Sequence, residues 1–352
     1  MAAFTPIDDP SAHFQVASYT GDGNDNRQVT NDGNSNLQPD WVWIKDRTQA
    51  QSNAVFDSSR GASIRLKTDD DSQESTESAT LKSFTSDGFT VGTSGTVNNG
   101  SNPDEYVAFQ WKANGGTTST NTAGDINSTV QANDTAGFSI VQHSDSSNGN
   151  SREIGHGLSA APAMVITRAR NRTENWRVGV KHYANHDGSY ILDNDTTFNN
   201  TSTLHTGTDS DSFGVGTDYS VNGTWNYISY VFREVKGYSK FGQFAGNSNS
   251  SGSFVYCGFK PALIFIKRRS NSGGWYMYNH KSSPTNMAVR ITRADIPDEE
   301  DVNNQYNLDM YSTGFKILNT NGGQGGATET YFMAAFAERP FVTSKGVPTV
   351  AR

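Results

Sequence analysis

The feature that most constrains the fold of this chain is an internal repeat. Three segments place a proline at the start of an apolar run, at Pro39, Pro162 and Pro261. An aromatic residue precedes each proline by 25, 24 or 23 positions, and a tyrosine that opens another apolar run follows it by 67, 65 or 70. Landmarks that keep their order and spacing three times indicate three copies of one structural unit. We therefore expect three units of about 100 residues in this 352-residue chain.

The pattern within each copy is typical of strands. In the first closing run, Val107, Phe109 and Trp111 alternate with their neighbours at period two. The run from Ala262 to Ile266 is apolar throughout, as expected for a strand buried on both faces. Turn residues recur every 8–12 positions. We predict an all-β fold of three tandem antiparallel β-sandwich, jelly-roll-like repeats, with a short helix only over 295–304.

Composition supports this fold class. About 40 % of the residues are Asn, Ser, Thr or Gly, 18 % are charged and 11 % are aromatic, so turns are plentiful and rings are available to fill a core. The net charge of −8 argues against nucleic acid as a partner, and apolar runs are too short to cross a membrane. The N-terminus lacks the pattern of a signal peptide. Cys257 is the one cysteine, expected as a small buried hydrophobe.

The spacing between copies predicts the domain organisation. The first two aromatic openers are 124 residues apart and the next two 100, and the excess falls in the Gly/Thr/Asn-rich segment 113–136. We expect this segment to be a linker that hinges the first unit to a rigid pair. The predicted organisation is an N-terminal docking arm (1–13), repeats at 14–112, 137–236 and 237–341, the linker at 113–136, and a C-terminal tail (342–352).

The sequence offers little that could carry catalysis. It contains no phosphate-binding loop, no HExxH and no GxSxG motif. Glu234 and Glu338 could form a glycosidase pair, but they occupy matching positions in two copies, which favours a role in the shared fold. We therefore predict no catalytic residue, no metal site and no cofactor.

Five residues are candidates for binding, because they recur between copies. Arg47, Arg170 and Arg269 each follow the proline by eight positions, behind a basic residue at position six. They either reach solvent and pair with carboxylates of the next loop, or contact a partner subunit or an anionic sugar. Trp176 and Trp275 follow the proline by 14 positions, where the first copy has Asn53. These indoles either pack in the core or form an exposed platform for a sugar ring.

Specific segments of the chain match a known pattern. They are Phe14-Gln15, Tyr19-Thr20-Gly21, Leu37 to Arg47, Phe56 to Gly61, Ser86 to Phe89, Tyr106 to Ala108, Trp111 to Ala113, and the junction from Glu234 to Gly242. Together they resemble a repeat domain of unknown function in virion proteins of tailed phages, especially marine and cyanobacterial ones. The resemblance extends over residues 14–352. The second and third copies depart from it in lacking the FDSxRG segment and the Trp-Lys-Ala ending.

The resemblance implies a non-enzymatic structural protein of the virion, made in the host cytoplasm. We expect a tail-associated fibre or tip component whose partners are other virion proteins and a host-surface glycan or other receptor. The analogy to fibres implies a homotrimer. The alternative is a capsid decoration or head-fibre protein that stabilises the particle without binding sugar. A polysaccharide depolymerase is disfavoured, because repeated sandwiches without a distinct acid pair offer no site.

Overall fold

The computed structural model describes residues 5–101, 104–145, 150–180, 188–302 and 304–349. Nearly all regular structure in these ranges is antiparallel β-sheet, so the all-β prediction is confirmed. The helical elements described are α1 (Gly95–Asn98) and two 3₁₀ turns, η1 (Pro10–Ala12) and η2 (Asn304–Tyr306). The helix expected over 295–304 is wrong. The carbonyls of Ile296 and Pro297 instead accept hydrogen bonds from Asn53 and Lys45 of the first copy.

The strands form three sandwiches, each with a large sheet and a three-stranded sheet. In the first sandwich, the strand order of the large sheet is β1 (Phe14–Thr20), β9 (Glu105–Trp111), β3 (Trp41–Asp46), β4 (Ala54–Asp57), β5 (Gly61–Leu66), β6 (Ser75–Thr76). The order of its small sheet is β2 (Arg27–Val29), β8 (Gly88–Val91), β7 (Leu81–Thr85). In the second sandwich, the strand order of the large sheet is β10 (Ser119–Asn121), β11 (Ser128–Asn133), β12 (Phe138–His143), β19 (Tyr227–Phe232), β14 (Met164–Ala169), β15 (Arg177–Val180), β16 (Tyr190–Ile191). The order of its small sheet is β13 (Arg152–Gly155), β18 (Ser212–Val215), β17 (His205–Thr208). In the third sandwich, the strand order of the large sheet is β20 (Ser239–Ala245), β28 (Thr330–Pro340), β22 (Phe259–Arg268), β23 (Trp275–Asn279), β24 (Arg290–Arg293), β25 (Asp301–Val302). The order of its small sheet is β21 (Phe254–Tyr256), β27 (Gly314–Ile317), β26 (Leu308–Tyr311).

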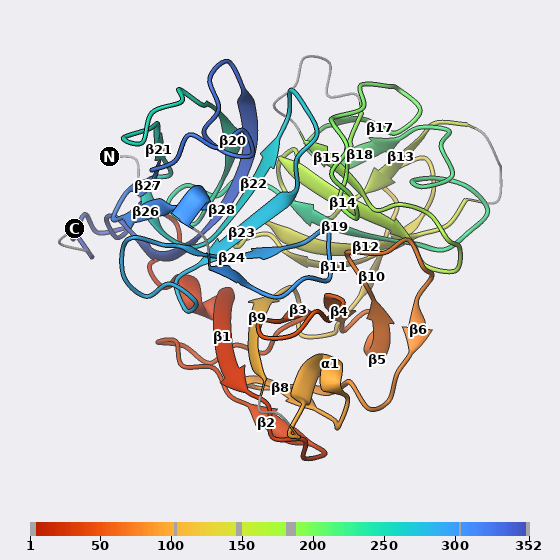
Figure 1. Ribbon diagram of the computed structural model, residues 1–352. Coiled ribbons are helices and arrows are strands. Elements are labelled where there is room, and N and C mark those ends of the chain that lie inside the picture. Colours follow the sequence, from red (N-terminus) through yellow and green to blue (C-terminus); the bar gives the residue numbers. More distant parts are fainter. Residues whose placement is uncertain (1–4, 102–103, 146–149, 181–187, 303, 350–352) are drawn as a thin grey trace.

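The three large sheets share one strand order at their centre. The strand that contains or follows the proline (β3, β14, β22) pairs with the closing strand (β9, β19, β28), which pairs on its other side with the opening strand (β1, β12, β20). Figure 1 shows the sandwiches around a common centre, the first (red to orange) below, the second (yellow to green) at upper right and the third (cyan to blue) at upper left. The centre of the molecule is therefore lined by three large sheets.

Segment 113–136 differs from the predicted linker. It contains β10 and β11, which extend the large sheet of the second sandwich, with Val130 opposite Val141 of β12. The side chains of Val130 and Gln131 are buried. Its Gly/Thr/Asn-rich composition reflects the edge strand β10, the neighbouring strand β11 and the turns that flank them, where little side-chain bulk is needed.

Alternation along the strands divides the core in two. In β3, Val42 and Ile44 pack toward the small sheet of the first sandwich, whereas Trp41 and Trp43 belong to a core shared by all three sandwiches. Successive side chains of a strand point to opposite faces, so a sheet apolar on both faces needs two covers. The small sheet supplies one cover and the neighbouring sandwiches supply the other.

The shared core is built from stacked rings contributed by each sandwich. Trp41 stacks on Tyr230 of the second sandwich at 4.2 Å between ring centroids and on Trp111 of its own at 4.4 Å. Phe14 of the first sandwich lies 5.3 Å from Phe336 of the third. The predicted hinge after the first unit is therefore wrong, because all three sandwiches bury aromatic surface against one another.

The N-terminal segment is also part of the body from residue 5 onward. Thr5 and Ile7 are buried, and Thr5 lies against the junction between the second and third sandwiches at Gly237. The carboxylate of Asp8 accepts hydrogen bonds from the amide and hydroxyl of Ser344 in the C-terminal tail, at 2.6 and 2.7 Å. Figure 1 shows the two ends of the chain on the same side. A free docking arm over 1–13 is contradicted for residues 5–13, while 1–4 lie outside the described residues.

Candidate functional site

The two tryptophans predicted as candidate sugar platforms lie inside the seams between sandwiches. Trp176 and Trp275 are 0 and 2 % exposed. Trp176 Nε1 donates to the carbonyl of Lys67 in the first sandwich at 2.6 Å, and Trp275 Nε1 donates to that of Ile191 in the second at 2.8 Å. The surface role is therefore contradicted, and the packing alternative holds. Each indole joins its own sandwich to the preceding one.

Asn53 takes the same position in the third seam. Its Nδ2 donates to the carbonyl of Arg293 in the third sandwich at 3.2 Å, while its Oδ1 accepts from Trp43 Nε1 at 2.9 Å. The three matching positions thus join the sandwiches in a closed cycle: first to third, second to first, and third to second. A single chain reproduces the head-to-tail contacts of a threefold ring.

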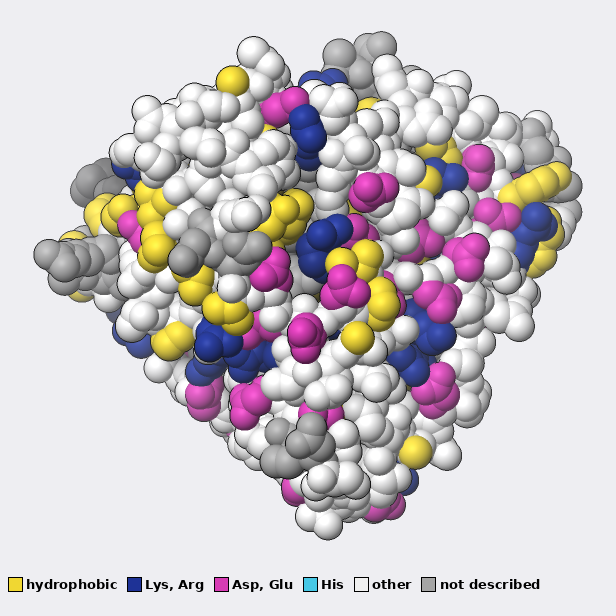
Figure 2. Space-filling view, in the orientation of Figure 1, with side chains coloured by type: hydrophobic (Ala, Val, Ile, Leu, Met, Phe, Trp, Pro, Cys, Tyr) yellow, Lys and Arg dark blue, Asp and Glu magenta, His cyan; other side chains and the backbone are white. Residues whose placement is uncertain are grey.

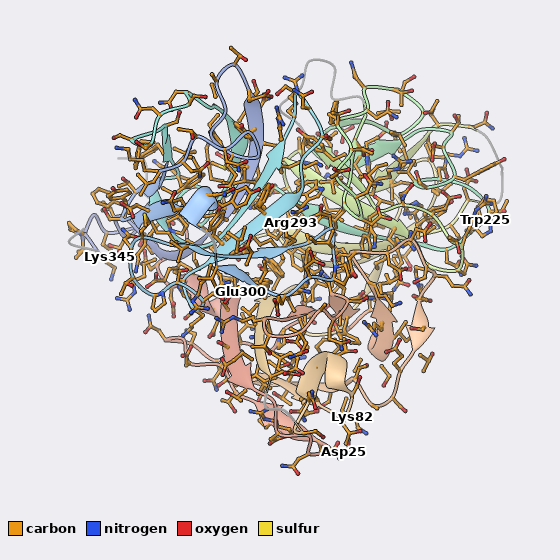
Figure 3. All side chains as sticks on the ribbon, in the orientation of Figure 1. Asp25, Lys82, Trp225, Arg293, Glu300 and Lys345 are labelled. Carbon is orange, nitrogen blue, oxygen red and sulfur yellow. The ribbon has the colours of Figure 1, made fainter. Side chains whose placement is uncertain are left out.

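Two of the candidate arginines bridge the same seams. Arg47 forms a bidentate pair with Glu300 of the third sandwich, at 3.0 and 2.8 Å, and Arg170 forms one with Glu74 of the first, with both distances 2.9 Å. Figure 3 labels Glu300 between the first and third sandwiches. Bidentate pairing fixes orientation as well as charge. These guanidinium groups are committed to carboxylates, as one alternative predicted, but across a seam and not within a loop.

The remaining basic positions divide between surface and interior. Arg269 is exposed, and its Nη1 lies 3.5 Å from Gln243 Oε1 of the same sandwich. Lys45 and Lys267, expected to reach solvent, are buried instead. Burial lowers the pKa of each ammonium group to about 8, with nearby carboxylates acting in the opposite sense. Of the three candidate arginines, Arg269 is the one that the structure places on the surface.

A prediction about the seams follows from the buried indole of Trp176. Replacing it with phenylalanine removes the donor to the Lys67 carbonyl and leaves that carbonyl without its partner. We expect the free energy of unfolding to fall by about 1–3 kcal/mol, measured by urea denaturation. Trp225→Phe is the matched control, because that indole is partly exposed. Equal stability of the two variants would contradict the role assigned to the seam hydrogen bond.

The two glutamates weighed as a catalytic pair are held in ion pairs. Glu234 accepts a hydrogen bond from Lys240 Nζ at 2.7 Å. Glu338 Oε2 forms an ion pair with Lys260 Nζ at 2.8 Å and lies 3.3 Å from His280 Nδ1. Burial raises the pKa of Glu338, but hydrogen bonds from His280 and Lys260 outweigh it and lower the pKa to about 2. Glu338 is therefore a carboxylate at neutral pH and holds no proton to donate as a general acid.

An exposed aromatic face distinguishes the third sandwich. Phe254 and Tyr256 of β21 and Tyr311 of β26 are 49, 64 and 38 % exposed. The rings of Phe254 and Tyr311 lie edge to face, 5.9 Å apart. Figure 2 shows hydrophobic side chains gathered at the left of the molecule, where Figure 1 places β21, β26 and β27. We call these three residues the aromatic face.

The other two sandwiches carry polar residues or glycine at the matching places. Strand register aligns Val255 with Val29 and Ile154, since each is buried and lies opposite a buried phenylalanine of the next strand. Where the third sandwich has Phe254, Tyr256 and Tyr311, the first has Gln28, Thr30 and Thr85, and the second has Glu153, Gly155 and Asp209. The fold does not need aromatic residues there. Lining up the three copies residue by residue would have revealed this difference from sequence.

Polar groups surround the aromatic face. Tyr311 Oη donates to Asp309 Oδ2 at 3.0 Å, and Lys316 Nζ donates to Ser251 Oγ at 2.8 Å. Partial desolvation, followed by the contact with Asp309, raises the pKa of Tyr311 above its ordinary value, so the hydroxyl stays protonated. Exposed rings beside hydrogen-bonding groups suit a ligand that is apolar on one side and polar at its edges.

A groove of about 180 Å³ runs along the edge of this face. Tyr256 and Phe341 form aromatic walls, and Lys240 and Glu234 line it as an ion pair. Cys257 also lines the groove and is itself buried, as predicted, and burial raises the pKa of its thiol to about 12. The thiol therefore stays protonated and unreactive at neutral pH.

Two other kinds of feature are absent from the described residues. No group of three or more His, Cys, Asp or Glu side chains is arranged to hold a metal ion. No helix in the same ranges is long and apolar enough to cross a membrane. The aromatic face and its groove are a candidate binding site.

Comparison with known proteins assigns the chain to a family. Residues 9–340 match the model of a domain of unknown function (DUF7483). Neither the curated proteins nor the solved structures include a match. Since the matched range takes in β1 through β28, and hence all three sandwiches and the seams between them, the chain belongs to the DUF7483 family.

Proposed function

We propose that this protein is a non-enzymatic structural component of a phage virion, associated with the tail as a fibre or tip component, and that it binds host-surface glycan. The virion assignment rests on the resemblance of its motifs to virion repeat domains. The glycan assignment rests on one observation, the aromatic face of the third sandwich. The three-lobed body, closed by seams, serves as a rigid mount for this face.

The size of the aromatic face favours a saccharide over a protein partner. The exposed fractions of Phe254, Tyr256 and Tyr311 together amount to about one and a half fully exposed rings, or roughly 300 Å². A stable protein interface needs about 800 Å² on each partner. Two or three sugar rings need far less, and their C–H faces pack on aromatic rings while their hydroxyls bond to groups such as Asp309 and Lys316.

Binding to host polysaccharide tests the glycan assignment. We expect the purified protein to bind surface polysaccharide of its host, and Tyr256→Ala to weaken that binding by about tenfold or more, because stacked aromatic contacts contribute most of the energy of such a site. Biolayer interferometry on immobilised polysaccharide measures both.

The matched control is Tyr219→Ala, which removes a ring of the second sandwich that is 40 % exposed. This variant should bind as the wild type does. Absence of binding by the wild-type protein would overturn the glycan assignment, and equal losses in the two variants would remove it from the aromatic face. Release of reducing ends from the polysaccharide would contradict the non-enzymatic assignment.

A capsid decoration or head-fibre protein remains the second candidate. The observation that favours it is the packing of residues 5–8 against the body, since Thr5 and Ile7 are buried and Asp8 is bonded to Ser344. A closed body of this kind suits a subunit that clamps neighbours on a particle. Labelling the protein in electron micrographs of the virion distinguishes head from tail.

A further inference from the structure

A second cleft lies at the seam between the first and third sandwiches. Its volume is about 150 Å³. One side is formed by η1, the start of β1 and the 32–34 loop of the first sandwich, and the other by β22, β28 and the turn after β23 of the third. It is separate from the groove beside the aromatic face, because no residue lines both.

The cleft combines an apolar floor with a charged rim. Phe14, Val16 and Ala262 are buried and supply the floor. At the rim, Lys281 Nζ donates to both carboxylate oxygens of Asp32, at 2.8 and 2.6 Å, so the two charges neutralise each other. The exposed lining is more polar than apolar, so the ligand that fits is polar over most of its surface, with a small apolar side and a charge at one end.

Arg339 carries a positive charge that has no close carboxylate partner among the described residues. Its side chain is 54 % exposed, and its ion-pair contact within the described residues is Nε to Glu338 Oε1, at 3.9 Å. Glu338 itself is already paired with Lys260 at 2.8 Å. A guanidinium group that presents free N–H donors matches a carboxylate or phosphate geometrically.

A buried polar atom at the same cleft lacks a partner. His280 lines the cleft, with Nδ1 held 3.3 Å from Glu338 Oε2. Its Nε2 is buried and has no hydrogen-bond partner among the described residues. Buried polar atoms are satisfied in the great majority of cases, so an orphan beside a cleft points to a group that is bound there.

We propose that this cleft binds a small organic anion, whose carboxylate or phosphate is held by Arg339, whose hydroxyl donates to His280 Nε2, and whose apolar side rests on Phe14 and Ala262. The inference does not depend on the virion assignment or on the aromatic face. An acidic sugar and a sugar phosphate share this chemistry, and the experiment distinguishes them.

The test is a set of separate titrations of the full-length protein with glucuronate, glucose 6-phosphate, glucose or inorganic phosphate, each measured by isothermal titration calorimetry. We expect at least one of the two sugar anions to bind, and both glucose and inorganic phosphate to bind at least about tenfold more weakly, since each lacks one half of the recognition. Arg339→Gln should weaken the sugar anion by about tenfold or more. His280→Gln tests the second contact, with weaker binding expected.

Lys82→Gln provides the matched control. Lys82 pairs with Asp25 at 3.1 Å near the tip of the first sandwich, as Figure 3 shows, so this variant removes a surface cation from an ordinary ion pair elsewhere. It should bind like the wild type, because Lys82 does not line the cleft. The proposal is overturned if neither sugar anion binds, if glucose or inorganic phosphate binds as tightly, or if Arg339→Gln binds like Lys82→Gln.

Discussion

Replacing Trp41 with alanine is expected to lower the free energy of unfolding by about 3–5 kcal/mol, as large-to-small changes at buried aromatic residues do. Trp41 is 2 % exposed, and its ring contacts Trp111 of its own sandwich and Tyr230, Phe138 and Phe232 of the second. The cavity would open where two sandwiches meet, beyond the reach of repacking within either one. Chemical denaturation followed by tryptophan fluorescence and circular dichroism measures the loss.

The same experiment examines whether the shared core makes the sandwiches unfold together. We expect coincident transitions by both probes in the wild type, because Trp41 and Phe14 bury surface against two different neighbours. Trp225→Ala is the control and should cost less than about 1 kcal/mol, since the ring is only partly buried. Separate transitions, or similar losses for the two variants, would show that each sandwich is stable alone.

Replacing Asp57 with alanine is expected to cost about 3–5 kcal/mol, because it leaves a buried positive charge with only the more distant carboxylate of Glu74, at 3.5 Å. Both Asp57 and Arg60 have side chains that are 0 % exposed. The Asp57 carboxylate accepts from Arg60 Nε and, at 2.8 Å, from Tyr230 Oη of the second sandwich. Although burial lowers the pKa of Arg60, the Asp57 carboxylate more than compensates and holds that pKa above its ordinary value.

A double variant separates the net contribution of the Asp57–Arg60 ion pair to stability from the penalty of leaving one of its charges unpaired. Asp57→Leu combined with Arg60→Met removes both charges and should destabilise the protein less than Asp57→Ala alone. Asp25→Ala, which breaks the exposed pair with Lys82, should cost no more than about 1 kcal/mol. Urea denaturation of the three variants measures these differences. A loss in the double variant equal to that in Asp57→Ala would contradict an origin in the unpaired charge.

The candidate residues show how far the sequence can be taken toward a site. Recurrence between copies singled out Trp176, Trp275, Arg47, Arg170 and Arg269, and the structure places the first four in seams and Arg269 on the surface. A residue that recurs in several copies supports a feature that those copies have in common. In this protein that common feature is the seam that each sandwich forms with its neighbour. Recurrence does not indicate the aromatic face, because its residues, such as Tyr256, have no aromatic counterpart in the other two copies.

Segment 113–136 shows where composition misleads. Small polar residues are common in linkers and also in edge strands, and propensity alone does not separate the two. Hydrogen bonding of β11 to β12 decides the matter, with Val130 opposite Val141. The expected hinge failed for a related reason, since a buried contact between distant segments leaves no local mark in the sequence.

The sequence by itself determined the all-β class, the threefold internal repeat, the position of the doubly buried strand after each proline, and the burial of Cys257. These properties follow from local periodicity and spacing, which the chain carries wherever its units are placed. The tertiary structure alone decided what covers the second face of each large sheet, and the answer is the other two sandwiches. That choice depends on ring stacking and carboxylate pairing between residues such as Trp41 and Tyr230, or Arg47 and Glu300, that lie about 190 to 250 positions apart. Their complementarity exists only once the three sandwiches have folded and met.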